Sequence, residues 1–326
     1  MVVLLGAAGS AAVLGGAYWL NQAYRQPGPL EAEATVVIER GAGGAEIAGQ
    51  LADAGVIGNP YVFLLGTRFA GLGGALQAGE YRFPPGISAQ AAAEMLATGA
   101  TRVHRITLPE GLTSKQVVGL LQDIETLVGE VDGVPPEGSL LPETYHFARG
   151  DRREHIVARM TQAMERTLAE LWPARAADLP FDTAEEALIL ASIVEKEAAL
   201  PEERPRIAAV FINRLRIGMP LQADPTVAYA VSDGEGSLAR PLTRADLRAP
   251  SPYNTYAVTG LPPGPIANPG RDSIRAVLNP AVTDELYFVA DGTGGHAFAR
   301  TLAEHNRNVA KWRAHQRRNT GQSASD

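Results

Sequence analysis

The sequence contains no cysteine, which excludes disulfide bonds, thiol catalysis and cysteine-ligated metal sites. Its 6 histidines show no HExxH pair or comparable metal spacing, and the chain has neither a G-x-S-x-G elbow nor a glycine-rich phosphate loop. Acidic residues number 36 against 29 basic ones, and a net charge of −7 is not that of a nucleic-acid-binding protein. We therefore expect no metal, no cofactor and no nucleic-acid partner.

What the sequence does contain is the composition of an ordinary globular protein. Its 326 residues are 45% hydrophobic and 20% charged, which excludes a largely disordered chain. This length has room for about two domains, each with a core of its own.

The run Met1–Leu20 carries no charged side chain over 20 residues, which is about the length of one helical membrane span. Tyr18 and Trp19 stand at its end, as interfacial aromatic residues do. A cleaved signal peptide is the alternative, but its basic n-region is missing. The first basic residue lies after the run, so the positive-inside rule taken literally would place the rest of the chain in the cytoplasm. We predict a retained transmembrane anchor over residues 1–21 and a polar linker over 22–33.

The next part of the chain repeats a pattern of short strand, glycine turn and amphipathic helix. The copies begin at Val36–Gly41, Tyr81–Gly86 and Ile106–Gly111. A capping box of Thr113 with Gln116 starts the helix of the third copy. Such units resemble LysM-like glycan-binding modules, and a packing module without a ligand is the alternative. We predict a small LysM-like βα module over residues 34–103.

The stretch Ala184–Arg216 holds two candidate acids, Glu195 and Glu197, at the end of a predicted helix. At about 100° per residue, they cannot share a helix face. The residues three, four and seven positions earlier are Val194, Ile193 and Leu190 for Glu197, and Ser192, Ala191 and Leu188 for Glu195. Glu197 is therefore expected in the apolar stripe, where burial raises its pKa and keeps a proton available for general acid catalysis. A helix end whose Glu197 turns outward is the alternative.

Polar and aromatic residues gather in the segments after these glutamates. They are Asn213, Arg214, Gln222, Asp224, Tyr253, Asn254, Thr255, Tyr256 and Asn268. Such a mixture suits a sugar, because rings stack on its faces while amides and carboxylates pair its hydroxyls. Each residue also has a structural interpretation: Asn213 can cap a helix, and Asp224-Pro225 is an ordinary turn.

The remaining segments complete the predicted layout of the larger domain. They are helices over Asp151–Leu171 and Glu203–Ile217, loops over Met219–Thr226 and Asp233–Ser237, strands over Glu285–Ala290 and His296–Thr301, a basic helix over Leu302–Arg318, and a polar tail over 319–326. We interpret the basic helix as one whose charged face is solvated and whose apolar stripe packs against the domain.

Five motifs resemble, in order, those of the YceG-like family of membrane-anchored endolytic murein transglycosylases. They are LASIVEKE (Leu190–Glu197), VFINRL (Val210–Leu215), LQADPT (Leu221–Thr226), YNTY (Tyr253–Tyr256) and GLPPG (Gly260–Gly264), with further similarity at Tyr287–Ala290 and Gly294–His296. Several of these motifs are long and unusual, so chance is a poor explanation. The resemblance covers nearly the whole chain.

The resemblance implies an enzyme that cuts nascent peptidoglycan strands between N-acetylmuramic acid and N-acetylglucosamine, leaving 1,6-anhydro ends. It also implies single-pass anchoring in the cytoplasmic (inner) membrane, with the catalytic domain on the periplasmic or extracytoplasmic side. Peptidoglycan glycan strands are the expected partner, and wall synthases are candidate neighbours.

In soluble lytic transglycosylases the catalytic glutamate closes a helix and is followed by serine. Glu197 takes that place here, and Ala198 stands where the serine would be, which puts a hydroxyl-assisted hydrogen bond in doubt. Glu197 would protonate the glycosidic oxygen and then, as a carboxylate, take a proton from the sugar's own 6-hydroxyl. The residues expected to bind substrate are Glu195, Asn213, Gln222, Asp224, Tyr253, Asn254 and Tyr256.

The predicted fold class is α+β: an N-terminal transmembrane helix, the small βα module, and a larger mixed α/β catalytic domain over residues 104–318. Two other functions stay open. One is a non-enzymatic glycan-binding scaffold of the wall-synthesis machinery. The other is a hydrolysing muramidase, in which a second carboxylate such as Asp224 or Glu143 activates water.

Overall fold

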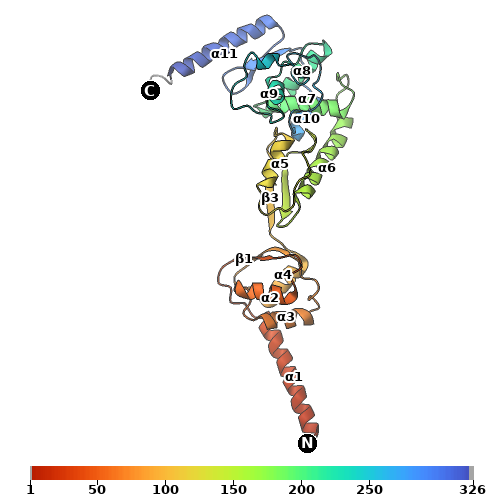
Figure 1. The fold of residues 1–326 in the computed structure, drawn as a ribbon, viewed down its shortest axis with the longest axis vertical. Coiled ribbons are helices and arrows are strands. Elements are labelled where there is room, and N and C mark those ends of the chain that lie inside the picture. Colours follow the sequence, from red (N-terminus) through yellow and green to blue (C-terminus); the bar gives the residue numbers. More distant parts are fainter. Residues whose placement is uncertain (1, 323–326) are drawn as a thin grey trace. The chain divides into compact units, whose positions relative to one another are not determined.

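The computed structural model describes residues 2–322, which form helices and short strands in two compact units (Figure 1). Unit 1 comprises the residues up to 105 together with 146–151, and unit 2 comprises 106–145 and the residues from 152 onward. The predicted mixture of helix and strand is therefore present in both units.

Unit 1 consists of helices around a two-stranded sheet. Its elements are α1 (Val2–Arg25), β1 (Ala34–Ile38), α2 (Gly44–Asp53), α3 (Pro60–Phe69), β2 (Gly79–Phe83) and α4 (Ala89–Thr98). β1 and β2 pair antiparallel, with Val36 opposite Tyr81. Side chains from both strands and from α2, α3 and α4 form one buried core, in which Leu51, Phe63 and Leu96 are fully enclosed. Burying each such side chain stabilises the fold by about 1.5–3 kcal/mol.

The predicted repeat of strand, turn and helix is confirmed. β1 precedes α2, β2 precedes α4, and β3 (Val103–Thr107) precedes α5 (Ser114–Gln122). Each pair is joined through a glycine with positive φ: Gly41 at 88°, Gly86 at 67° and Gly111 at 77°. Glycine suits these turns because it enters the left-handed region without a steric penalty. The capping box that begins α5 is also present, with Thr113 and Gln116 bonding each other's backbone N–H.

The prediction of an N-terminal transmembrane helix is wrong. α1 is helical, but none of the helices within residues 2–322 is long and apolar enough to cross a membrane. The run Met1–Leu20 holds 4 glycines and 5 alanines, which contribute little apolar surface, and polar residues follow it. Tyr24, near the end of α1, packs into the core of unit 1, where Gly66 lets the ring lie against α3. The single-pass inner-membrane localisation depended on this helix and is corrected with it.

Unit 2 is built mainly from helices. Its elements after α5 are β4 (Thr144–Ala148), α6 (Arg153–Leu171), α7 (Ala184–Glu197), α8 (Arg204–Arg216), α9 (Asp224–Val231), α10 (Arg271–Leu278), β5 (Tyr287–Ala290), β6 (His296–Ala299) and α11 (Leu302–Gln322). β3 pairs with β4, and the division between the units falls within both strands. β5 and β6 form an antiparallel hairpin, with Phe288 opposite Phe298.

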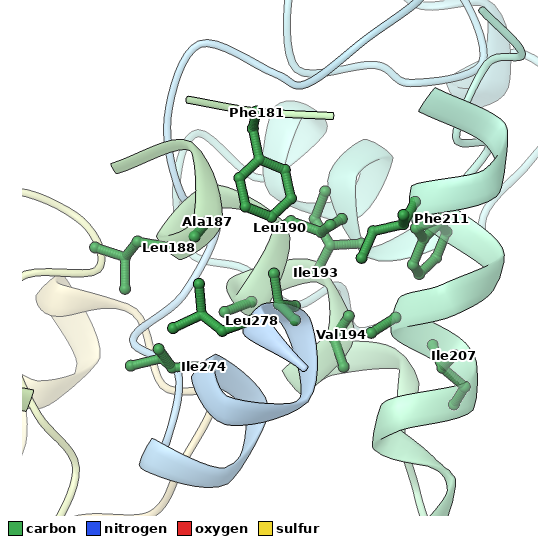
Figure 2. Close-up of a cluster of buried hydrophobic side chains, with 14 of the residues drawn as sticks. Phe181, Ala187, Leu188, Leu190, Ile193, Val194, Ile207, Phe211, Ile274 and Leu278 are labelled. Carbon is green, nitrogen blue, oxygen red and sulfur yellow. The ribbon is translucent and has the colours of Figure 1, made fainter. Parts of the chain in front are cut away.

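Helix α7 lies at the centre of the unit 2 core. It begins with a capping box of Thr183 and Glu186 and is buried along most of its length. Figure 2 shows Leu190, Ile193 and Val194 of this helix among apolar side chains of α8 and α10. Because packing on several sides fixes α7, the position of its last residue, Glu197, is fixed as well.

Candidate active site

Glu197 is the last residue of α7, and the chain leaves the helix at Ala198 with extended backbone angles. The residue is half-buried because it lines a pocket, and protein atoms surround its carboxyl group. No hydrogen bond to that carboxyl comes from another of the described residues, 2–322. Its oxygens are therefore available to a ligand.

The environment of Glu197 favours the protonated carboxyl group. Burial and, to a smaller extent, the negative charge of Asp224 raise its pKa to about 8, whereas the positive charge of Arg214 opposes the shift. An ordinary glutamate would be ionised at neutral pH. Glu197 keeps its proton there and can donate it, which is the requirement for a general acid.

The pocket next to Glu197 has a volume of about 290 Å³ and combines polar groups with aromatic walls. It is lined by Glu197, Phe211, Arg214, Leu221, Gln222, Asp224, Tyr256, Tyr287, Phe288, Leu302 and His305. These residues come from four helices, one strand and two loops of unit 2. A pocket with this lining can hold a sugar by ring contacts and hydrogen bonds.

Asp224 and Tyr256 form a hydrogen-bonded pair in the pocket. The Tyr256 hydroxyl donates to Asp224 Oδ1 at 2.6 Å, and burial together with this carboxylate raises the tyrosine pKa. The turn before Asp224 is tied to the segment of Tyr256, because the backbone N–H of Gln222 donates to the Thr255 carbonyl at 3.1 Å. Gln222 itself has a φ of 51°, a left-handed conformation that non-glycine residues seldom adopt outside constrained sites.

Arg214 places a buried positive charge beside the two carboxyl groups. It is only 7% exposed, and its guanidinium donates to the Leu286 carbonyl at 2.7 Å and to the Leu221 carbonyl at 2.6 Å. It also lies over the Tyr287 ring, 5.3 Å from the centroid. Arg214 thereby connects α8 to β5 and to the turn before α9, and it holds the pocket walls together.

The structure brings four of the predicted site residues to this pocket: Glu197, Gln222, Asp224 and Tyr256. The other four lie outside its lining, and their role in substrate binding stays a prediction. Asn213 donates to the carbonyls of Thr283 and Glu285, and Asn254 is fully buried and donates to those of Leu247 and Ala249. The Tyr253 ring packs against that of Tyr229, with 5.0 Å between centroids.

Glu195, the fourth of these residues, is engaged in internal bonds. Its carboxylate accepts from Arg204 at 3.2 Å and from the backbone N–H of Gly270 at 2.9 Å. Gly270 is the residue before α10, so this contact joins the end of α7 to the start of α10. The two glutamates of α7 therefore differ in what they contact: Glu195 bonds protein groups, and Glu197 faces a pocket.

The pocket is also lined by Arg214, Tyr287 and His305, which were not among the residues expected to bind substrate, although Arg214 belongs to the polar cluster noted in the sequence. Arg214 had a signal, since a cation within an apolar helical run must find buried partners. Tyr287 lies in the stretch Tyr287–Ala290, which resembles the family, but its approach to Glu197 was not predictable. His305 gave no signal, because α11 reaches the pocket only through the tertiary fold.

Comparison with known proteins gives consistent relatives. The sequence pattern of the YceG-like family matches residues 36–311. The endolytic murein transglycosylase of Bacillus subtilis is 33% identical over 92% of this chain and 91% of its own length. That of Streptococcus pneumoniae is 31% identical over 85% of this chain, which spans 58% of the relative. A crystal structure of a yceG-like protein from Listeria monocytogenes, 31% identical, matches with a TM-score of 0.54 over 84% of this chain and 98% of that chain.

The pocket thus contains, at the end of a buried helix, one carboxyl group that holds its proton at neutral pH, as a general acid must. The family match extends over most of the chain and includes every residue that lines this pocket. The chain belongs to the YceG-like family. The likeness of residues 34–103 to LysM modules gains no support from these findings.

Proposed function

We propose that this chain is an endolytic murein transglycosylase in which Glu197 serves as both acid and base. The observation that carries the proposal is the position of Glu197 in a polar and aromatic pocket, with a pKa of about 8. Relatives 31–33% identical are named for the same activity. The substrate is then a peptidoglycan glycan strand, and the bond that breaks joins N-acetylmuramic acid to N-acetylglucosamine.

In the first step Glu197 donates its proton to the glycosidic oxygen. The bond from that oxygen to C1 of the muramic acid breaks, and the departing sugar leaves with a new hydroxyl group. Positive charge develops on the C1 side of the remaining ring, as in other glycosidic cleavages. Asp224 lines the same pocket, and its carboxylate can stabilise that charge.

In the second step the Glu197 carboxylate takes the proton from the 6-hydroxyl of the same sugar, whose oxygen bonds to C1. The product is a 1,6-anhydro end, and no water enters the reaction. Arg214 favours the carboxylate form that this step requires, because its positive charge lowers the Glu197 pKa against the larger effect of burial. Intramolecular attack gains from proximity, so one acid and base suffices.

The rate of the reaction is expected to fall at high pH. The active form of the free enzyme carries a protonated Glu197, so kcat/KM should fall as the pH rises through about 8. Asp224→Asn removes a negative charge that raises this pKa, so the fall should begin at lower pH in the variant. The measurement is kcat/KM for product formation between pH 5 and about 10.

A matched control is Asp284→Asn, since the side chain of Asp284 is 68% exposed and does not line the pocket. Its pH profile should superpose on that of the unsubstituted protein. An alkaline limb that stays in place in Asp224→Asn would show that Asp224 does not act on the catalytic acid.

The mass of the product tests the reaction itself. Purified glycan strands incubated with the protein should yield fragments whose new ends are lighter by one water than hydrolysed ends. Mass spectrometry of the digest makes this distinction directly. Fragments that carry the added water would instead identify a muramidase, and an unchanged strand that still binds would identify a glycan-binding scaffold.

The muramidase is the second candidate because Asp224 lies in the same pocket as Glu197 and could activate water. Glu143, the other carboxylate considered for that role, does not line the pocket. The relatives' activity favours the lytic route. A wall synthase as neighbour stays a prediction, to be tested by co-purification.

A further inference from the structure

We propose that His305, from the C-terminal helix α11, is a positioning residue that donates a hydrogen bond from Nε2 to the bound glycan. The identity of the ligand rests on the proposed function. α11 contributes Leu302 and His305, one helical turn apart, to the lining of the Glu197 pocket. A helix whose sequence indicated only a solvated basic face thus supplies part of the site.

The imidazole ring of His305 is held in place by stacking. It lies on the Tyr287 ring with 5.3 Å between centroids and 27° between planes. Tyr287 is held in turn by the Arg214 guanidinium, 5.3 Å from its centroid. The stacking contacts therefore fix the orientation of the His305 ring without a hydrogen bond to either of its nitrogens.

The two nitrogens of His305 differ in their surroundings. Nδ1 is buried and, among residues 2–322, has no hydrogen-bond partner. A proton on Nδ1 would be a buried donor without an acceptor, near the positive charge of Arg214. The stable form is the neutral ring with its proton on Nε2, the nitrogen that is not enclosed in this way. Burial and Arg214 also lower the pKa of His305, in agreement with the neutral form.

A neutral imidazole with its proton fixed on Nε2 is a donor of defined direction. Sugar hydroxyls, carboxylates and N-acetyl carbonyls all accept such a bond. A site that binds through a fixed donor holds the strand in one register, with the bond to be cut next to Glu197. His305 would then act on catalysis by positioning, without exchanging a proton.

Three substitutions separate this role from packing. His305→Phe keeps the ring on Tyr287 and removes both nitrogens. His305→Gln carries an amide group that reaches the position of Nε2, whereas the shorter His305→Asn reaches only that of Nδ1. We expect kcat/KM on purified peptide-free glycan strands to fall about 10-fold or more in the Phe and Asn variants and to stay within about 3-fold in the Gln variant. His155→Phe, at an exposed position of α6, is the matched control and should match the unsubstituted protein.

The inference is overturned if His305→Phe is as active as the unsubstituted protein, or if Asn restores activity as well as Gln. A binding measurement separates this outcome from failure of the proposed function. The Kd of the same strands is measured for Glu197→Gln with and without His305→Phe, and it should rise about 10-fold with the second change. If the unsubstituted protein forms no anhydro-ended product, the proposed function fails, and an unchanged Kd would reject the role of His305.

Discussion

Replacing Glu197 with glutamine is expected to lower the formation of anhydro-ended products by about 10³-fold. Glutamine matches glutamate in size, but its amide cannot protonate the glycosidic oxygen and cannot take the proton of the 6-hydroxyl. Both steps are affected because one carboxyl group performs both. The initial rate of product release from purified glycan strands, followed by mass spectrometry, measures the effect.

Two controls make this result specific. Glu202→Gln, at an exposed position shortly after α7, should retain full activity. Glu195→Gln alters the contacts with Arg204 and Gly270, so its effect should appear in stability as well as in rate. Substantial activity in Glu197→Gln with none in folded Glu195→Gln would move the assignment to Glu195.

The stability of Glu197→Gln provides an independent check on the pKa. Folded protein holds the Glu197 proton up to about pH 8, whereas an unfolded glutamate releases it near the ordinary value of 4.5. The folded state binds more protons in this window, so the stability of the unsubstituted protein falls as the pH rises through it. Glutamine does not titrate, so Glu197→Gln does not lose this stability as the pH rises. The melting temperature of Glu197→Gln should therefore exceed that of the unsubstituted protein at pH 9, with the difference vanishing near pH 4.

The central helix could be predicted from sequence, but helical spacing alone does not distinguish the surroundings of its two glutamates. Apolar spacing predicts α7, and the structure has it from Ala184 to Glu197. The helix face that precedes Glu195, which is less apolar than that before Glu197, is nevertheless buried too, since Leu188 is 8% exposed and Ala191 is fully enclosed. The difference between the glutamates lies in their partners, Arg204 and Gly270 for Glu195, and no single sequence displays such long-range bonds.

Two short helices were missed because their start signals also serve as turn signals. Asp224-Pro225 is also typical of a turn, yet proline in the first turn of a helix has a suitable φ and loses no intrahelical hydrogen bond. α10 follows a loop rich in proline and glycine and is only 8 residues long. Both helices matter to the site, because α9 presents Asp224 and α10 packs against α7.

The closure of the pocket could not be predicted for a different reason. Tyr287 and His305 lie far along the chain from Glu197, on a strand and a helix whose local pattern indicates only packing. Their approach to the pocket depends on how β5 docks on α8 and how α11 docks on β5 and β6. Arg214 is the residue that joins these parts, through carbonyls at the start of β5 and before α9.

Replacing Arg214 with methionine is therefore expected to destabilise the protein by about 3 kcal/mol or more. Methionine has a similar length but leaves the carbonyls of Leu221 and Leu286 without their charged donor, and each unsatisfied buried carbonyl costs about 1–3 kcal/mol. Urea unfolding measures the loss. The free energy of unfolding of Arg214→Lys should lie between those of the unsubstituted protein and Arg214→Met, since one ammonium group cannot reproduce the planar arrangement of the guanidinium donors.

Arg216→Met is the matched control. Arg216 is exposed on the same helix, and its bonds to the Asp178 carbonyl at 2.9 Å and to Asn213 Oδ1 at 3.2 Å are exposed, so the same change there should cost about 1 kcal/mol or less. Any Arg214→Met protein that remains folded should also hold the Glu197 proton to higher pH, since the positive charge that lowers this pKa is gone. Equal unfolding midpoints for the two methionine variants would show that Arg214 does not hold the pocket walls. A lower Glu197 pKa in Arg214→Met would show that its charge does not act on the catalytic carboxyl group.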